Sequence, residues 1–281
     1  MKKQFVRYIA GLLAAFAPVV STIAQTSFRP PSVPLVACNP YFSLWSPADK
    51  LNGADTTHWT GKAQRLTSLV RIDGKTFRLM GSEPAAVPAL PQTKLEVLPT
   101  RTIYSFAGEG VSVKLTFMTP ALPEDIDILS RPVTYLTYDC AATDGQKHSI
   151  ETYFDAASEL TVNTPDQAVT WSAEKISGIN AVKVGSKDQR ILAKSGDDLR
   201  IDWGYLYVAA ASGQKALVSQ VDAAAGRTAF AGQGKLSAAV ASSESPARTA
   251  PVSALVFNFG KVGEKSVSHW MMLAYDEIFM Y

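Results

Sequence analysis

Beyond residue 94, the sequence is a succession of short alternating segments separated by turn residues, and this pattern constrains the fold more than any other feature. Segments such as 102–106 and 111–118 are rich in Val, Thr, Tyr and Phe, and Gly, Asp or Asn bound them. Alternation with a period of two is typical of half-buried strands, and even spacing is typical of sandwiches and barrels. The sequence therefore predicts an all-β fold, an antiparallel β-sandwich with few short helices. The expected strands are 94–98, 102–106, 111–118, 131–142, 148–156, 159–163, 168–175, 180–186, 199–211, 215–223, 252–262 and 265–277.

A small β-hairpin module is expected to precede this sandwich. Residues 35–45 are apolar and aromatic and predict one strand, which leads into a polar loop over 46–62. Asp73-Gly74 between alternating apolar residues predicts a tight hairpin over 70–79, because a type I′ turn needs positive φ at both central positions. Residues 81–93 are rich in Pro and Ala and predict a linker. The expected domains are therefore 26–84 for the module and 85–281 for the sandwich. The apolar C-terminal residues predict that the sandwich domain is truncated at its C-terminal end.

The first 25 residues have the pattern of a secretory signal peptide. Lys2, Lys3 and Arg7 precede an apolar run over 8–20, and small residues follow up to a cleavage point near Ala24. The alternative is an N-terminal membrane helix, but the run is short for a stable anchor. We therefore expect a bacterial protein in the periplasm or outside the cell, with no membrane attachment after signal removal.

Charge and metal-ligating residues exclude several classes of function. The 27 basic and 25 acidic residues nearly cancel and form no basic block, so a nucleic-acid partner is not expected. The three histidines and two cysteines have no metal-ligand spacing, so neither a metal nor another cofactor is predicted. Cys38 and Cys140 could form a disulfide in an oxidising compartment, or remain two buried thiols.

The polar loop and the C-terminal residues supply the candidate site residues. Trp45 and Trp59 bracket the loop, where they could stack on a sugar, cover a domain junction or be buried. The pKa of an ordinary histidine suits His58 to acid–base chemistry, but a structural hydrogen-bonded histidine is favoured. His148 follows a turn and is expected to be exposed. The candidate ligand or domain-interface residues are Trp45, Asp55, His58, Trp59, Asp276 and Glu277, and no catalytic residue is assigned.

Three longer stretches resemble one protein family. They are "CNPYFSLWS" with "HWTGK", "LVRIDGKTFRLMG", and "VSHWMMLAYDE" near the end. Together they are similar to the N-terminal part of the glutaminase A family, and the resemblance extends from about Pro30 to Tyr281. Relatives often have Asp where this chain has Asn39, which weakens any catalytic role for that position.

The resemblance implies an architecture and an activity for the intact protein. It implies a first module, a β-sandwich, and then a large helical domain of α/α-toroid type as the partner of the sandwich. It also implies hydrolysis of L-glutamine to L-glutamate and ammonia, with this fragment inactive alone. The sandwich equally resembles those that precede catalytic domains of carbohydrate enzymes. The alternative is therefore an accessory or carbohydrate-binding sandwich, with a small amide or a sugar as substrate.

Overall fold

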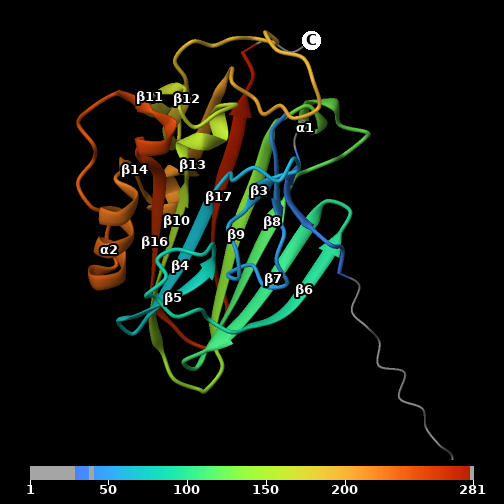
Figure 1. The fold of residues 1–281 in the computed structure, drawn as a ribbon. Coiled ribbons are helices and arrows are strands. Elements are labelled where there is room, and N and C mark those ends of the chain that lie inside the picture. The colour runs from blue at the N-terminus through green and yellow to red at the C-terminus, as the bar shows by residue number, and fades with distance from the viewer. Residues whose placement is uncertain (1–28, 38–40, 279–281) are drawn as a thin grey trace, which may run out of the picture.

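The chain folds into two packed antiparallel sheets and a smaller third sheet in the computed structural model, which describes residues 29–37 and 41–278 (Figure 1). The predicted all-β sandwich is confirmed. The predicted signal peptide lies outside the described residues. None of the described helices is long and apolar enough to cross a bilayer.

The larger sheet has nine strands in the order β15-β11-β12-β13-β17-β9-β8-β7-β6. All of its neighbouring strands are antiparallel. Its strands are β6 (Gln92–Leu98), β7 (Arg101–Gly108), β8 (Val111–Met118), β9 (Val133–Ala142), β11 (Ala168–Ile176), β12 (Ile179–Ser186), β13 (Tyr205–Ala211), β15 (Glu244–Pro246) and β17 (Val267–Asp276).

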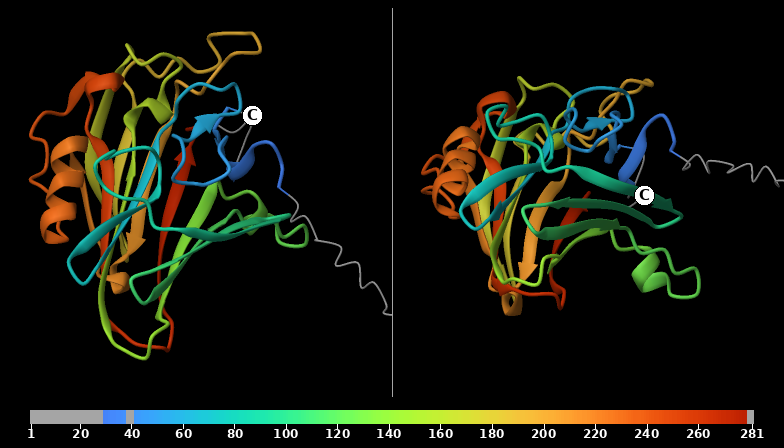
Figure 2. Two further views of the ribbon diagram at one scale, coloured as in Figure 1. Left: turned by 60° about the horizontal axis from the view of Figure 1, so that its bottom comes forward. Right: turned by 90° about the horizontal axis from the view of Figure 1, so that it is seen from below.

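The other sheet of the sandwich has five strands in the order β14-β16-β10-β4-β5. Figure 2 shows the two sheets as stacked layers whose strands curve around a common interior. The strands are β4 (Leu66–Ile72), β5 (Lys75–Met80), β10 (His148–Ala156), β14 (Leu217–Val221) and β16 (Val252–Val262).

Period-two alternation explains how the two sheets share a core. In β9, the side chains of Leu136, Tyr138 and Cys140 are fully buried, whereas the intervening Thr137 and Asp139 are only half-buried. Successive side chains of a strand point to opposite faces, so one face of β9 lies against the other sheet. Each large apolar side chain buried in this way contributes about 1.5–3 kcal/mol to stability.

The hairpin predicted around Asp73-Gly74 is confirmed. β4 pairs with β5, and both turn residues have positive φ, 46° at Asp73 and 89° at Gly74. β4 also pairs with β10. The hairpin is therefore part of the five-stranded sheet and shares its hydrogen bonds.

The single strand expected over 35–45 is wrong. The chain instead forms β1 (Val33–Ala37) and β2 (Ser43–Ser46), which pair antiparallel, and β3 (Thr57–His58) adds to β2. These three strands make a separate sheet. The sequence contained a signal against one strand, because Pro40 has no N–H to donate to a ladder.

Helices and turns account for the other differences. Residues 159–163 were expected as a strand, but a 3-10 helix η1 (Ser158–Thr161) begins there and buries all four of its residues. The expected strand 199–211 begins only at Tyr205. Two further 3-10 turns are η2 (Ser212–Gln214) and η3 (Ala247–Thr249). The short helix α1 (Ile126–Leu129) lies between β8 and β9.

Helix α2 (Ala223–Gln233) covers the outer face of the five-stranded sheet (Figure 1). It begins at Asp222, whose carboxylate accepts from the Ala225 N–H, and ends at Gly234 with φ 67°. Phe230 packs on Tyr153 of β10 with ring centroids 5.3 Å apart. The helix therefore adds a second, smaller core outside the sandwich.

His148 was expected to be exposed, and this is wrong. The residue is only 9 % exposed, at the start of β10. Its Nδ1 lies 2.6 Å from Asp73 Oδ2 and its Nε2 lies 3.0 Å from Asp144 Oδ1. The imidazole therefore joins the β4–β5 turn to the β9–β10 turn. These hydrogen bonds to carboxylates raise the pKa of His148.

Candidate functional site

The polar loop between β2 and β3 is held by hydrogen bonds within the fold. Asp55 accepts from the backbone N–H of Ser82 at 3.0 Å and from its hydroxyl at 2.5 Å. Trp45 is half-buried, and its indole N–H donates to Ser43 Oγ at 2.8 Å. These bonds connect the loop to residues following β5 and to its own sheet. Both side chains therefore have structural partners.

His58 and Trp59 are neighbours with opposite environments. The His58 side chain is fully buried, and its Nδ1 accepts from the Thr60 N–H at 3.3 Å. The Trp59 side chain is 53 % exposed, with its ring 5.5 Å from the imidazole. A buried imidazole cannot exchange protons readily with solvent, whereas an exposed indole can contact another molecule. Trp59 is thus the accessible member of the pair.

The end of β17 lies beside the residues that precede β13 and those that join β1 to β2. The Tyr275 hydroxyl donates to Trp203 O at 2.8 Å, and Trp203 contacts Tyr41 with ring centroids 5.3 Å apart. Asp276 and Glu277 directly follow Tyr275, and Asp276 is exposed. Burial raises the pKa of Tyr275 well above its ordinary value. The structure thus places the predicted acidic pair at the edge of an aromatic cluster.

Arg200 connects this cluster to the Trp59 loop. Its side chain is only 8 % exposed, and Nη1 donates to Asp198 Oδ1 at 2.6 Å and to Thr60 Oγ1 at 3.3 Å. The guanidinium also donates twice to Asn163 O. The hydrogen bond from Arg200 lowers the pKa of Asp198. Three segments distant in sequence therefore converge on one cation.

A polar pocket of about 230 Å³ opens beside Arg200. Arg65 forms its wall and holds the buried Glu159 with Nε–Oε1 and Nη2–Oε2 distances of 2.9 and 2.7 Å. Lys62 adds an exposed ammonium group. The hydrogen bond to Glu159 raises the pKa of Arg65. With the two pairs Arg65–Glu159 and Arg200–Asp198 neutralised, Lys62 leaves the pocket weakly positive.

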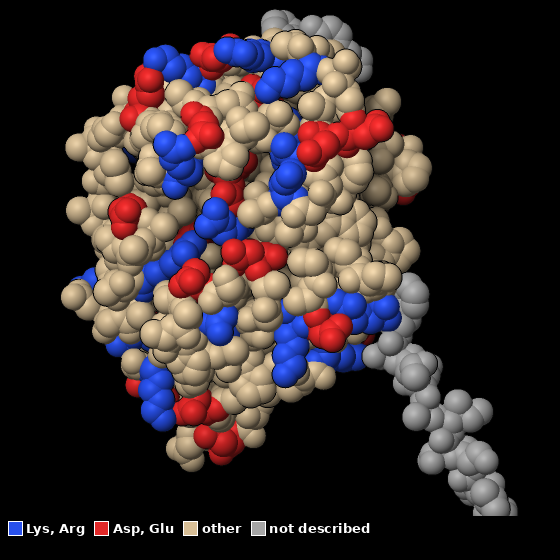
Figure 3. Space-filling view, viewed as in Figure 1, with Lys and Arg blue, Asp and Glu red and all other residues tan. Residues whose placement is uncertain are grey.

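Charges on the face seen in Figure 3 are mixed, with blue and red groups interspersed over most of it. No extended basic surface appears on this face, in agreement with the near balance of charges in the sequence. The electrostatics of this face therefore favour no polyanion.

An apolar surface around α1 was not predicted from the sequence. The helix buries none of its residues, and Ile126 is 76 % exposed. We call the surface formed by Ile126 and the exposed apolar side chains around it the α1 surface. Its other large exposed apolar side chains are Leu98, Leu122 and Leu129, with exposures of 41, 42 and 46 %.

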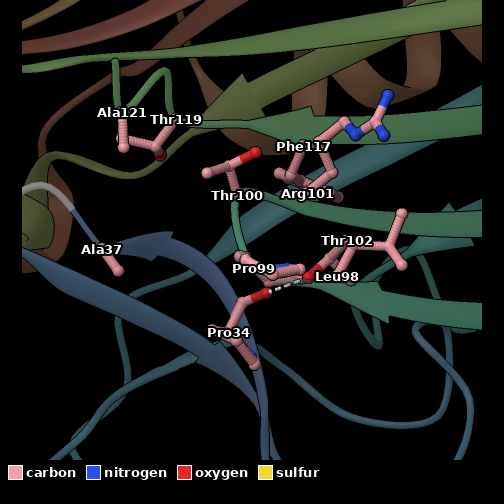
Figure 4. A pocket seen from close by; sticks show the side chains of 11 residues that line it. Pro34, Ala37, Leu98, Pro99, Thr100, Arg101, Thr102, Phe117, Thr119 and Ala121 are labelled. Atoms are coloured by element: carbon pink, nitrogen blue, oxygen red, sulfur yellow. Dashed lines mark hydrogen bonds between the residues drawn. The ribbon is translucent and has the colours of Figure 1, made fainter. Parts of the chain in front are cut away.

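Two cavities adjoin the α1 surface. One, of about 160 Å³, lies between β1 and the turn joining β6 to β7, and Figure 4 shows Pro34, Thr100 and Phe117 around it. Thr102 Oγ1 donates to Pro34 O at 2.7 Å across its wall. The other cavity, of about 330 Å³, is mainly apolar and shares Thr100 and Ala121 with the first. Neither cavity is lined by a carboxylate or histidine, so both suit apolar groups better than acid–base chemistry.

The described residues contain no group of three or more His, Cys, Asp or Glu that could hold a metal ion. Cys140 is buried, and burial raises the pKa of its thiol. Cys38 lies outside the described residues, so the disulfide between the two stays a prediction. Trp59 was a candidate from the sequence, and the structure places it at the surface. The α1 surface was not predicted, because the exposure of apolar side chains depends on tertiary packing.

Comparison with protein families supports the resemblance seen in the sequence. Residues 100–279 match a family described as "Domain of unknown function (DUF5127)", which covers more than half of the chain. Residues 12–91 match "Domain of unknown function (DUF4964)".

Two curated fungal proteins are similar to the chain. One is "Glutaminase A" of Aspergillus oryzae, 28 % identical over 204 residues, which are 69 % of this chain and 29 % of the relative. The other is "Probable glutaminase/05536" of Arthroderma benhamiae, 25 % identical over 237 residues, 73 % of this chain and 26 % of the relative. The chain thus spans less than a third of the length of these relatives.

A solved bacterial glucoamylase in complex with acarbose shares the fold, with a TM-score of 0.50 and 10 % identity over 87 % of this chain and 32 % of that protein. At this identity the likeness concerns the fold alone. The family matches and the fungal relatives confirm the resemblance drawn from the sequence motifs. The chain therefore belongs to the DUF5127 family and resembles the N-terminal region of proteins named glutaminase A.

Proposed function

We propose that the chain is a non-catalytic N-terminal module of a secreted glutaminase-type amidohydrolase, and that it packs against a helical domain carrying the chemistry. The intact protein would convert L-glutamine to L-glutamate and ammonia in the periplasm or outside the cell. Similarity to two glutaminase-named proteins, over less than a third of their lengths, supports this assignment.

The observation that carries the non-catalytic role is the engagement of the candidate polar residues within the fold. His58 is buried against Thr60, and both Asp55 contacts are with Ser82. Hydrolysis of an amide needs a nucleophile or activated water within reach of a base and of a charge-stabilising group. His58 and Asp55 do not form a solvent-accessible base in contact with a nucleophile.

The assay for this role is ammonia release from L-glutamine by the purified chain. We expect no release above the buffer rate, across pH 5–9. Sustained release that is lost in His58→Gln or Asp55→Asn would place the chemistry inside this chain and refute the proposal. A Trp45→Phe variant serves as the control, because Trp45 contacts Ser43 rather than either polar candidate.

A second candidate function is sugar binding at Trp59. The indole is 53 % exposed beside a loop that also supplies the pocket residue Lys62. Aromatic side chains offer large flat contact areas with apolar character, which suit the faces of pyranose rings. Titration with neutral and acidic oligosaccharides, followed by tryptophan fluorescence, tests this. A saturable signal that disappears in Trp59→Ala and persists in Trp45→Phe supports sugar binding, and unchanged fluorescence counts against it.

A further inference from the structure

We infer that the α1 surface is the docking site for the helical domain, which inserts apolar side chains into the two cavities beside α1. The inference rests on the proposed function, because it names the surface through which the proposed module meets its partner. It differs from the expectation drawn from the sequence, in which the candidate ligand or domain-interface residues were Trp45, Asp55, His58, Trp59, Asp276 and Glu277.

The first argument is the amount of apolar side chain that α1 leaves in solvent. Ile126, Leu122 and Leu129 have exposures of 76, 42 and 46 %, and Leu98 adds 41 % from the end of β6. Covering the exposed parts of these four side chains would remove apolar surface from water, which favours association. Contiguous exposed apolar patches of this kind mark interaction sites.

The second argument is the shape beside these side chains. Cavities of about 160 and 330 Å³ share Thr100 and Ala121 in their walls, and most of their lining residues are apolar or Thr. Figure 4 shows the smaller one. Projecting side chains next to concave sites allow interdigitation, which is how apolar interfaces reach the packing density of protein interiors. A helix that presents apolar residues three and four positions apart fits such a surface.

The third argument is the charge around the apolar centre. Glu124 precedes α1, Asp127 lies in its first turn, and Arg101 and Arg131 line the cavities. Within the residues that the structure describes, none of these four has an ion pair. Charges around an apolar centre steer and orient a partner of complementary charge. A docked domain would therefore present both basic and acidic side chains around the apolar centre of the interface.

The course of the chain favours a domain of the same polypeptide as the occupant. β17 runs beside β9, with Ala274 opposite Val133, and the Tyr275 N–H donates to Pro132 O at 3.0 Å. Pro132 follows α1 by only three residues. A polypeptide that continues from β17 would begin next to the α1 surface, and the curated relatives have more than three times the matched length. A tethered domain in this position has a high effective concentration for docking.

The test uses the full chain encoded by the gene, read beyond Tyr281. We expect a helical region of several hundred residues. In that chain, we expect Ile126→Asp to separate one cooperative thermal transition into two and to expose residues 120–135 to hydrogen exchange. The matched control is Ile176→Asp at the end of β11, where the isoleucine is 51 % exposed. The control should retain one transition.

The outcomes separate the two proposals. A stop codon directly after Tyr281 would overturn the proposed function, and the docking inference with it. A helical domain whose coupling is unchanged in Ile126→Asp would overturn the docking inference alone. Dimers of the full chain that dissociate in Ile126→Asp would assign the surface to a second copy and also overturn it. In the present chain alone, Ile126→Asp should leave the urea midpoint unchanged, because α1 buries none of its residues.

Discussion

The attachment of α2 to the five-stranded sheet depends on one buried carboxylate. The Asp155 side chain is fully buried, and it accepts from Arg227 Nε at 2.8 Å and from Arg227 Nη2 at 2.9 Å. The Tyr153 hydroxyl donates to the same carboxylate at 2.8 Å. Burial alone lowers the pKa of Arg227, but the attraction to Asp155 and their hydrogen bonds outweigh it, so the net pKa is raised.

Replacing Arg227 by Met tests how much this pair stabilises the fold. Methionine retains most of the aliphatic volume but removes the charge and leaves Asp155 with Tyr153 as its remaining donor. Removing one partner of a buried pair costs about 3–5 kcal/mol, because an uncompensated charge stays buried. With an m-value of about 3 kcal/mol/M, the urea midpoint should fall by about 1–1.7 M.

Urea unfolding followed by tryptophan fluorescence gives this midpoint, and Arg190→Met is the matched control. Arg190 pairs with Asp188, but their side chains are 57 and 54 % exposed, so this pair should contribute about 0–1 kcal/mol. Equal midpoints for the two variants would refute the reasoning. Adding Asp155→Asn to Arg227→Met should recover part of the loss, since no buried charge would remain.

Three further predictions concern stability. Because the pKa of His148 is raised, its contribution to stability is complete below about pH 6.5 and declines as the pH rises through the folded-state pKa. The urea midpoint should therefore fall less between pH 6 and pH 9 in His148→Gln than in the unchanged chain. An equal fall in the two proteins contradicts this. Gln64 is fully buried, and its side-chain amide N and O have no hydrogen bond within the described residues. Gln64→Met should therefore raise the free energy of unfolding by about 1 kcal/mol, measured by urea unfolding. A lower free energy of unfolding contradicts this prediction. Gly204 has φ 81°, and a Cβ there would clash with the carbonyl oxygen of Asp276, so Gly204→Ala should lower the thermal midpoint by several degrees. Gly213→Ala has open space around it and should leave the thermal midpoint unchanged.

Local signals were sufficient to predict many of the strands. Alternation identifies β8 and β9 because one face of each is buried, and Asp73-Gly74 identifies the β4–β5 hairpin because few residues accept its backbone angles. The pairing of β4 with β10 joins residues far apart in sequence, and no local pattern encodes it. The sequence therefore predicts the class of the fold better than the order of its strands.

Errors occurred where tertiary contacts outweighed local preference. Residues 159–163 alternate like a strand, but Glu159 turns inward to meet Arg65, and the segment becomes a 3-10 helix. His148 follows a turn, where exposure is the usual outcome, but carboxylates from two turns enclose it. Both cases involve charge pairing between segments that are distant or separated by a turn, which residue periodicity does not register.

The site residues show the same limit. His58 and Trp59 are adjacent and equally plausible in the sequence, yet one is fully buried and the other is half exposed. A strand sends successive side chains to opposite faces, so adjacency itself implies divergent environments at the end of β3. Which face is buried depends on the sheet that covers it. No residue near Ile126 in the sequence indicated that α1 would lack a covering layer.

The two ends of the sandwich differ in the apolar surface that they expose, and this difference favours a partner at one of them. At one end, His148 lies between Asp73 and Asp144, and Lys75 pairs with Glu109 at 2.8 Å, so the turns stabilise one another. At the other, α1 presents Ile126 to solvent beside two apolar cavities. The ion pairs stabilise the turns at the first end, whereas α1 buries none of its residues and so contributes no apolar packing to the fold. Burial of that helix by a docked domain would lower the free energy of the assembly without altering the sandwich.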